Sequence, residues 1–393
     1  MIKYIDEVEI TNKKVLVRVD YNISFKKDGS VNDDTRITNS LPTLQLLLKR
    51  GNRLILMSHL GKPKGRDMAF SMKPVAERLQ IYLPDYSVRL IDDFLSLQTS
   101  EVCKGQTEKE IFVLENTRFY DGEKKNDSVF SKQLADLAEV YVDDAFGSAH
   151  RAHASTVGVA SFLPSYGGLL LKKEVQIIKK VIEAPERPVV AIIAGAKISS
   201  KIGLIEKLMS IADTVLIGGA MTNNFLKAKG MEIGKGLIEL DFVPEAKRLL
   251  DLAASQQKQI ILPIDRRIGI KTDEINTPVI KKVEEISVID ETLDIGSETE
   301  TLFKEYISKA KTIIWNGPVG YFENPQFAKG SIAVYDAIIA NFSAISILGG
   351  GDTLSVIKKL PNKDKITHIS TGGGAMLELI EKGTLPGLDA LDK

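Results

Sequence analysis

The sequence predicts an α/β protein made of two doubly wound parallel-sheet (Rossmann-like) domains joined by a long helix. Three observations support this prediction. The chain of 393 residues is too long for one ordinary core and suits two domains of roughly 150–200 residues each. Short β-branched apolar runs alternate with longer segments of helical period, which is typical of parallel sheets covered by helices. A long helical segment interrupts this alternation near the middle of the chain.

Four apolar runs in the first half are predicted to be strands. They are "KVLVRV" at 14–19, "RLILM" at 53–57, "IFVL" at 111–114 and "VYV" at 140–142. Between the first two runs, residues 36–50 place Ile37, Leu41, Leu44 and Leu48 on one face, which predicts a helix.

Six further runs predict the strands of the second half. They are "PVVAIIAG" at 188–195, "TVLIGG" at 214–219, "IILPI" at 260–264, "TIIWNG" at 312–317, "AISILGG" at 344–350 and "ITHIS" at 366–370. Residues 167–188 predict the long helix, which two glycines open and prolines close. We therefore place the domain connection there, with a first domain at 1–170 and a second at 171–375 that begins with this helix.

Composition excludes several classes of partner. Lys plus Arg equals Asp plus Glu, 52 against 52, so no bulk charge attracts nucleic acid or a membrane surface. The single cysteine, Cys103, forms no internal disulfide and fits a reducing compartment. The N-terminal residues contain no apolar signal region, and no stretch approaches the ~20 apolar residues that span a bilayer. We expect a soluble, cytoplasmic protein without a Cys/His metal cluster.

Polar side chains follow each predicted strand of the first half. Because carboxyl ends of parallel strands share one edge of a sheet, we expect these side chains to gather there. Guanidinium groups bind carboxylate or phosphate as a bidentate fork, so the set suits a small anionic molecule. For any one arginine, an ordinary surface salt bridge is the more common role. The residues are Asp20, Asn22, Arg36, His59, Arg118 and Arg151.

Two histidines flank the last of these arginines in "DDAFGSAHRAHAST". His150 and His153 are half of the four histidines of the chain. Neither a cysteine nor a further clustered histidine completes a metal site, so we expect both rings to orient or pack beside Arg151.

The second half follows its strands with glycine instead. Gly-rich turns that enter helices let backbone N–H groups meet phosphate, and several such turns on successive strands indicate a nucleotide site. The turns are "AGAKISSK" with Lys197 and Lys201, "IGGA" with Gly218 and Gly219, "WNGPVGYFE", "ILGGGDT" and "STGGGAM". Asp352 in "GGGDT" is a candidate Mg²⁺ ligand. Neither G-x-x-x-x-G-K-[ST] nor a complete G-x-G-x-x-G is present.

An anion site and a nucleotide site together indicate phosphoryl transfer, which needs positioning and cations more than a nucleophilic side chain. That chemistry favours Arg36, Lys197 and Mg²⁺ as the catalytic groups. Two alternatives stay open on these grounds: another ATP-dependent acid kinase or ligase, and a non-catalytic two-lobed binding protein that closes on an anion.

The motifs also resemble, nearly end to end, those of the phosphoglycerate kinase family. The segments that carry the resemblance are "VLVRVDYN", "DDTRI", "SHLGKPKG", "LENTRFY", "DDAFGSAHRAHAST", "GAKISSKI", "GGAM", "WNGPVGYFE", "GGGDT" and "STGGGAMLELIEKGTLPGLDAL". The resemblance implies reversible transfer from 1,3-bisphosphoglycerate to ADP, giving 3-phosphoglycerate and ATP. It also implies in-line transfer across a hinged, closing inter-domain cleft, and a C-terminal tail, 376–393, that returns to the first domain. We expect a monomer.

The resemblance assigns roles to individual residues. In the first domain Asp20, Asn22, Arg36, His59, Arg118 and Arg151 would hold the glycerate ligand, with Lys62 as a peripheral contact. Arg36, Lys197 and the N–H groups of Gly372 and Gly373 would stabilise the moving phosphoryl group. The nucleotide contacts would be Lys197, Lys201, Gly218, Gly219, Asn316, Glu323, Gly350, Gly351, Asp352 and Thr353, with Glu323 at the ribose, Gly218 and Gly219 at the adenine, and Asp352 through Mg²⁺.

Three positions depart from the family pattern. Lys62 replaces an arginine and loses the bidentate fork, while Ser200 replaces an aspartate beside Lys201. The segment "IDRRIGIKTD" at 264–273 matches poorly, which predicts a rebuilt loop near the adenine site.

Overall fold

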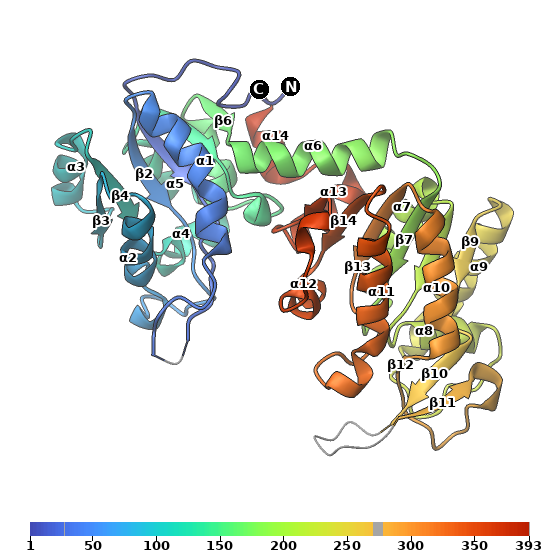
Figure 1. The fold of residues 1–393 in the computed structure, drawn as a ribbon. Coiled ribbons are helices and arrows are strands. Elements are labelled where there is room, and N and C mark those ends of the chain that lie inside the picture. Colours follow the sequence, from blue (N-terminus) through green and yellow to red (C-terminus); the bar gives the residue numbers. More distant parts are fainter. Residues whose placement is uncertain (27, 270–277, 393) are drawn as a thin grey trace. The chain divides into compact units, whose positions relative to one another are not determined.

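The computed structural model describes residues 1–26, 28–269 and 278–392 (Figure 1). The chain forms two compact units: unit 1 comprises Met1–Gln176 and Thr384–Lys393, and unit 2 comprises Ile177–Gly383. Each unit contains one parallel six-stranded sheet, which confirms the predicted fold class. Among the described helices, none combines the length and the apolar character that crossing a bilayer requires.

The unit 1 sheet has the strand order β3-β4-β2-β1-β5-β6, with neighbouring strands parallel. Its central strands bury nearly every side chain on both faces, which is why they read as continuous apolar runs. The strands are β1 (Lys14–Arg18), β2 (Arg53–Met57), β3 (Ser87–Ile91), β4 (Glu110–Leu114), β5 (Val140–Asp143) and β6 (Ser165–Gly167).

Two strands of unit 1 were not predicted from the sequence. β3 pairs with β4 at the edge of the sheet, so its residues alternate between exposed and more buried positions. Its sequence, SVRLI, therefore lacks a continuous apolar run. β6 has only 3 residues, too few to show any period.

The helices of unit 1 cover this sheet and position its loops. α1 (Thr35–Lys49) confirms the predicted helix, and Ile37, Leu44 and Leu48 are buried against the core. The other helices are α2 (Lys73–Tyr82), α3 (Leu97–Lys104), α4 (Asp121–Lys125), α5 (Ser128–Ala135) and the C-terminal α14 (Pro386–Leu391). α14 is tied to the unit by the Gly387 N–H, which donates to the Ala149 carbonyl oxygen over 2.8 Å.

The main sheet of unit 2 has the order β15-β14-β13-β7-β8-β9 and is also parallel. Its six strands correspond to the six predicted runs. They are β7 (Val189–Ile193), β8 (Thr214–Ile217), β9 (Gln259–Ile261), β13 (Thr312–Asn316), β14 (Ile345–Gly349) and β15 (His368–Ile369). The helices of this unit are α7 (Ile202–Ile211), α8 (Thr222–Ala228), α9 (Val243–Ser255), α10 (Ser297–Lys309), α11 (Lys329–Ala340), α12 (Gly351–Ile357) and α13 (Gly374–Lys382).

A second, antiparallel sheet in unit 2 was not predicted. Its order is β11-β10-β12, with β10 (Asp265–Ile268) between β11 (Val279–Lys282) and β12 (Thr292–Ile295). The sequence of β10 is DRRI, and because three of its four residues are charged it contains no apolar run that would predict a strand. The prediction of a loop at 264–273 is therefore wrong for 265–268, while 270–273 lie outside the described residues.

α6 (Leu169–Glu183) matches the long helix predicted at 167–188, and the boundary between the two units in the chain falls within it. The unit boundaries differ in detail from those predicted at 170 and 376. α13 packs against α7 and belongs to unit 2, so only the residues from Thr384 onward return to unit 1.

Candidate functional site

The loop after β1 and the start of α1 bring three predicted residues of unit 1 together. The Asp20 carboxylate forms an ion pair with the Arg36 guanidinium in the first turn of α1. The Gly61 N–H, in the loop after β2, donates to Asn22 Oδ1 over 2.9 Å. Hence two loops at the carboxyl end of the sheet are fixed to each other by these polar groups.

Arg118 lies beside the same loop and is only 6% exposed. Its Nη1 donates to the Gly61 carbonyl oxygen over 2.6 Å, whereas Nε and Nη2 have no hydrogen-bond partner within the described part of the chain. Burial lowers the pKa of Arg118 to about 10, and the nearby charges of Arg151 and Arg18 act in the same direction. Two buried donors among like charges indicate a place where an anion would be stabilised.

His59 is held as a neutral ring in this cluster. Burial lowers its pKa well below the usual value, and the charges of Arg18, Arg118 and Arg151 lower it further. Arg18 Nη2 lies 2.8 Å from His59 Nδ1. Since a guanidinium only donates, Nδ1 accepts, and the proton of the neutral ring is on Nε2. His59 therefore offers a donor without a charge.

Arg151 and its two flanking histidines contact protein groups. Arg151 Nε donates to His150 Nε2 over 3.1 Å, and His153 Nδ1 lies 3.7 Å from Glu123 Oε1. Lys62 is exposed next to Gly61. Within the described residues, no group of three or more His, Cys, Asp and Glu side chains is arranged to hold a metal ion.

Two buried residues beneath the cluster were missed from the sequence. Arg18 is fully buried, and its Nε donates to Ser155 Oγ over 3.0 Å. Glu123 accepts hydrogen bonds from Ser155 N and Oγ. Burial raises the pKa of Glu123, but His153, Arg18 and Ser155 together outweigh this effect and lower it. Arg18 could have been identified from the sequence, because it is a charged residue within the apolar run "KVLVRV" of a predicted buried strand.

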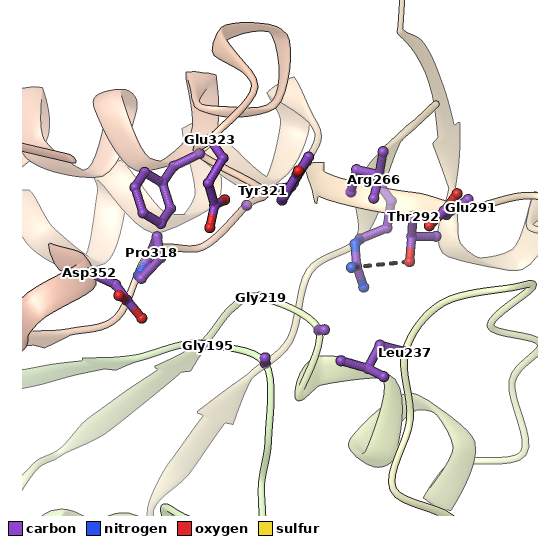
Figure 2. A pocket seen from close by; sticks show the side chains of 15 residues that line it. Gly195, Gly219, Leu237, Arg266, Glu291, Thr292, Pro318, Tyr321, Glu323 and Asp352 are labelled. Carbon is purple, nitrogen blue, oxygen red and sulfur yellow. Dashed lines mark hydrogen bonds between the residues drawn. The ribbon is translucent and has the colours of Figure 1, made fainter. Parts of the chain in front are cut away.

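Unit 2 contains a pocket with an empty volume of about 720 Å³, part of which is open to solvent. Of the predicted nucleotide contacts, Gly219, Glu323 and Asp352 line it. Figure 2 shows Asp352 toward one end, and Arg266 and Thr292 toward the other, with Gly195 and Gly219 between them.

Lys201 lies next to the Asp352 end of the pocket. Its Nζ donates to the Ala194 carbonyl oxygen over 2.7 Å and to Asn316 Oδ1. Burial lowers the pKa of Lys201 to about 8, and the carboxylate of Asp352 partly opposes this shift. Ser200, which stands where the family pattern has an aspartate, donates to the Lys197 carbonyl oxygen. Lys201 is therefore held by Ala194 and Asn316 and not by Ser200. Lys197 is exposed.

Several other predicted residues shape the loops around the pocket. Gly219 has φ +70°, and a Cβ there would lie 2.6 Å from the backbone of Gly195, so the close approach requires glycine. Thr353 is buried and accepts from the Gly317 N–H over 2.7 Å, while Asn316 Nδ2 donates to the Gly349 carbonyl oxygen. Gly218 packs against Val319, and Gly350 has φ +103°.

The last Gly-rich turn leads into α13. The Gly372 N–H donates to Ser370 Oγ over 3.1 Å, so this predicted donor already has a partner. Gly373 has φ +50°, and Gly351 in the preceding turn has open space at its Cβ position. These glycines leave the backbone accessible.

This chain is similar to known proteins over all or nearly all of its length. A family model of phosphoglycerate kinase matches residues 5–383. The phosphoglycerate kinase of Finegoldia magna is 46% identical over 394 residues, which cover 100% of this chain and 99% of that protein. That of Koribacter versatilis is 46% identical, with 98% of each chain covered. The solved phosphoglycerate kinase of Coxiella burnetii has a TM-score of 0.89 at 34% identity and covers 100% of this chain and 99% of that one. The chain therefore belongs to the phosphoglycerate kinase family.

Proposed function

We propose that this chain catalyses the reversible transfer of a phosphoryl group from 1,3-bisphosphoglycerate to ADP, giving 3-phosphoglycerate and ATP. In the reverse direction it is a phosphotransferase with a carboxyl group as acceptor. The observation that carries the proposal is Arg118, whose buried Nε and Nη2 lack partners among the described residues and adjoin two further arginines. A small ligand with carboxylate and phosphate groups supplies the acceptors that these donors need.

The glycerate ligand is held in unit 1. Arg118 and Arg151 pair with its anionic groups, and the neutral His59 donates from Nε2. Asp20 and Asn22 bind hydroxyl or carboxyl groups of the ligand. The ion pair with Arg36 holds Asp20 in place, and the hydrogen bond from the Gly61 N–H holds Asn22. Lys62 makes a peripheral contact from the surface.

The nucleotide occupies the pocket of unit 2. Gly218 and Gly219 flank the base, Glu323 binds the ribose, and Lys201 and the turn Gly350–Thr353 lie toward the phosphates. Asn316 orients Lys201 through its Oδ1 atom.

Asp352 fits a magnesium ion bound together with the phosphates. Mg²⁺ takes one or two carboxylates and completes its shell with phosphate oxygens and water. Asp352 is an exposed carboxylate at the pocket end nearest Lys201. When bound, Mg²⁺ neutralises charge on the phosphate oxygens.

Transfer itself depends on cations that face the moving group. Arg36 from unit 1, together with Lys197 and the backbone at Gly373 from unit 2, stabilises the charge on the equatorial oxygens. The Gly372 N–H joins them by exchanging its bond to Ser370 Oγ for one to the phosphoryl group. Direct in-line transfer also requires the two units to close during the reaction, with the connecting chain acting as a hinge. We further propose that the enzyme is monomeric, and that it is cytoplasmic because its single cysteine fits a reducing compartment.

A coupled assay with Mg-ATP and 3-phosphoglycerate tests the proposal. Glycerate and acetate serve as control acceptors, because they lack the phosphate group that the arginine cluster selects. We expect turnover with 3-phosphoglycerate and none with glycerate or acetate. Equal turnover with acetate would favour another acid kinase, and binding without turnover would favour a non-catalytic protein.

A further inference from the structure

Two adjacent arginines on β10 have opposite environments. Arg267 is paired, because its Nη1 contacts the Asp294 carboxylate at 3.4 Å and the Glu300 carboxylate at 2.6 Å. Arg266 points to the other face of the strand, where it lines the pocket of unit 2 (Figure 2). It is only 2% exposed.

The contacts of Arg266 leave much of its hydrogen-bonding capacity unused. Nη1 lies 3.3 Å from Asn223 Oδ1 and Nη2 lies 3.3 Å from Thr292 Oγ1, both neutral acceptors at long range. Nε has no partner among the residues that the structure describes. Asn223 is itself oriented, since its Nδ2 donates to the Leu237 carbonyl oxygen over 2.8 Å.

An uncompensated guanidinium is costly to bury. Burial lowers the pKa of Arg266 to about 10, and the charge of Asp294 partly opposes this shift. Hydrophobic residues would fill the same wall of the pocket without that cost. A ligand that brings acceptors to this wall compensates the unused donors, as ligands do for other buried polar groups in binding sites.

The position of Arg266 in the pocket indicates which part of a nucleotide it meets. Asp352, the proposed magnesium ligand, lies toward the opposite end in Figure 2, with Gly219 between the two. With its phosphates at Asp352, a nucleotide extends its base toward Arg266.

The base that suits a guanidinium is a 6-oxopurine. Guanine and hypoxanthine present O6 and N7 as adjacent acceptors, to which arginine donates in a bidentate manner. Adenine presents the N6 amino group in place of O6, so two donors would face each other. This inference rests on the proposed function and extends it to the choice of base.

We propose that Arg266 is a specificity-determining residue through which this enzyme uses guanosine and inosine nucleotides at least as well as adenosine nucleotides. The wild-type protein is assayed with 3-phosphoglycerate and the magnesium complexes of ATP, GTP, ITP and 2-aminopurine riboside triphosphate. Inosine has O6 but no 2-amino group, whereas 2-aminopurine has the 2-amino group but no O6. The expected result is a kcat/KM for GTP and ITP equal to or above that for ATP, and a low value for 2-aminopurine.

Several wild-type outcomes overturn the inference. Activity with ATP but little with GTP and ITP would refute it while leaving the proposed function intact. High activity with 2-aminopurine and low activity with ITP would show that the 2-amino group is read, for instance by Glu291 on the pocket wall, and not O6 by Arg266. Activity with no nucleotide would instead refute the proposed function.

The variant Arg266→Met tests the residue directly. Its ratio of kcat/KM for GTP to that for ATP should fall by about tenfold or more, given the discrimination that a bidentate arginine provides. The ratio is measured within one protein, so a general loss of stability cancels. Arg267→Met is the matched control, because it removes the paired arginine next door and should leave the ratio unchanged. An unchanged ratio in Arg266→Met, or an equal fall in both variants, would overturn the assignment.

Discussion

Replacing Arg118 by methionine should weaken 3-phosphoglycerate binding without destabilising the protein. Methionine keeps most of the side-chain volume of arginine and removes its five donors. In the free protein these donors are poorly used: Nη1 bonds to Gly61, while Nε and Nη2 are unpartnered within the described residues. We therefore expect the Arg118 guanidinium to contribute more to the free energy of ligand binding than to the free energy of folding.

The magnitude follows from the two unused donor atoms. A hydrogen bond that involves a charged group contributes about 1.5–3 kcal/mol, so two such bonds amount to about 3–6 kcal/mol. This corresponds to a Kd for 3-phosphoglycerate that is about 10²–10⁴-fold higher in the variant. Removing a buried charge that lies beside Arg151 and Arg18 should leave Tm unchanged or raise it.

Calorimetry of 3-phosphoglycerate binding and thermal unfolding provide the two measurements. Arg50→Met is the matched control in the same unit, because Arg50 Nη1 donates to the carbonyl oxygens of Ile5 and Val8 at 2.6 and 2.9 Å. The control should lower Tm and leave Kd unchanged. An Arg118→Met protein that unfolds at a much lower temperature but binds 3-phosphoglycerate normally would refute the reasoning.

Three further predictions concern transfer and the nucleotide. Arg36→Ala should reduce turnover by about 10²-fold or more with the fold intact, because it removes a cation that faces the transferred group; a near-normal kcat would show the assignment to be wrong. Burial lowers the pKa of Lys201 to about 8, so this side chain loses its proton as the pH rises through that value. The affinity for Mg-ADP should therefore fall above pH 8. Titration calorimetry from pH 7 to 10 checks this effect, and it should be absent in Lys201→Arg, since arginine stays charged. Asp352→Ala should weaken Mg-nucleotide binding and leave the Kd of 3-phosphoglycerate unchanged; equal losses for both ligands would contradict a metal role.

The sequence predicted the parallel strands well because they are buried on both faces. Strands such as β7, which reads VVAII and buries all five residues, carry an unbroken apolar signal. The same rule explains the misses. β3 lies at an edge and alternates, while β10 is short and charged, so neither contains the apolar run on which the prediction depends.

The sequence predicted that polar side chains following the strands would gather at one sheet edge, and their role in binding stays a prediction. Asp20 and Arg118 lie in loops of this kind, and the structure brings them to the same edge of the unit 1 sheet. Buried charged groups that lie inside strands and helices were not singled out from the sequence. Arg18 belongs to a strand and Glu123 to a helix, so no loop motif identifies them, and only the fold brings both to Ser155.

The sequence by itself determined the two α/β units, the family and the residue types at the strand ends, because these follow from local period, burial on both faces and motifs of contiguous residues. Only the tertiary structure decided which of those charges are compensated. Arg266 and Arg267 are adjacent and identical in type, yet strand geometry turns one toward two carboxylates and the other toward the pocket. Their partners, at Asn223, Thr292, Asp294 and Glu300, come from distant parts of the chain that only folding brings together.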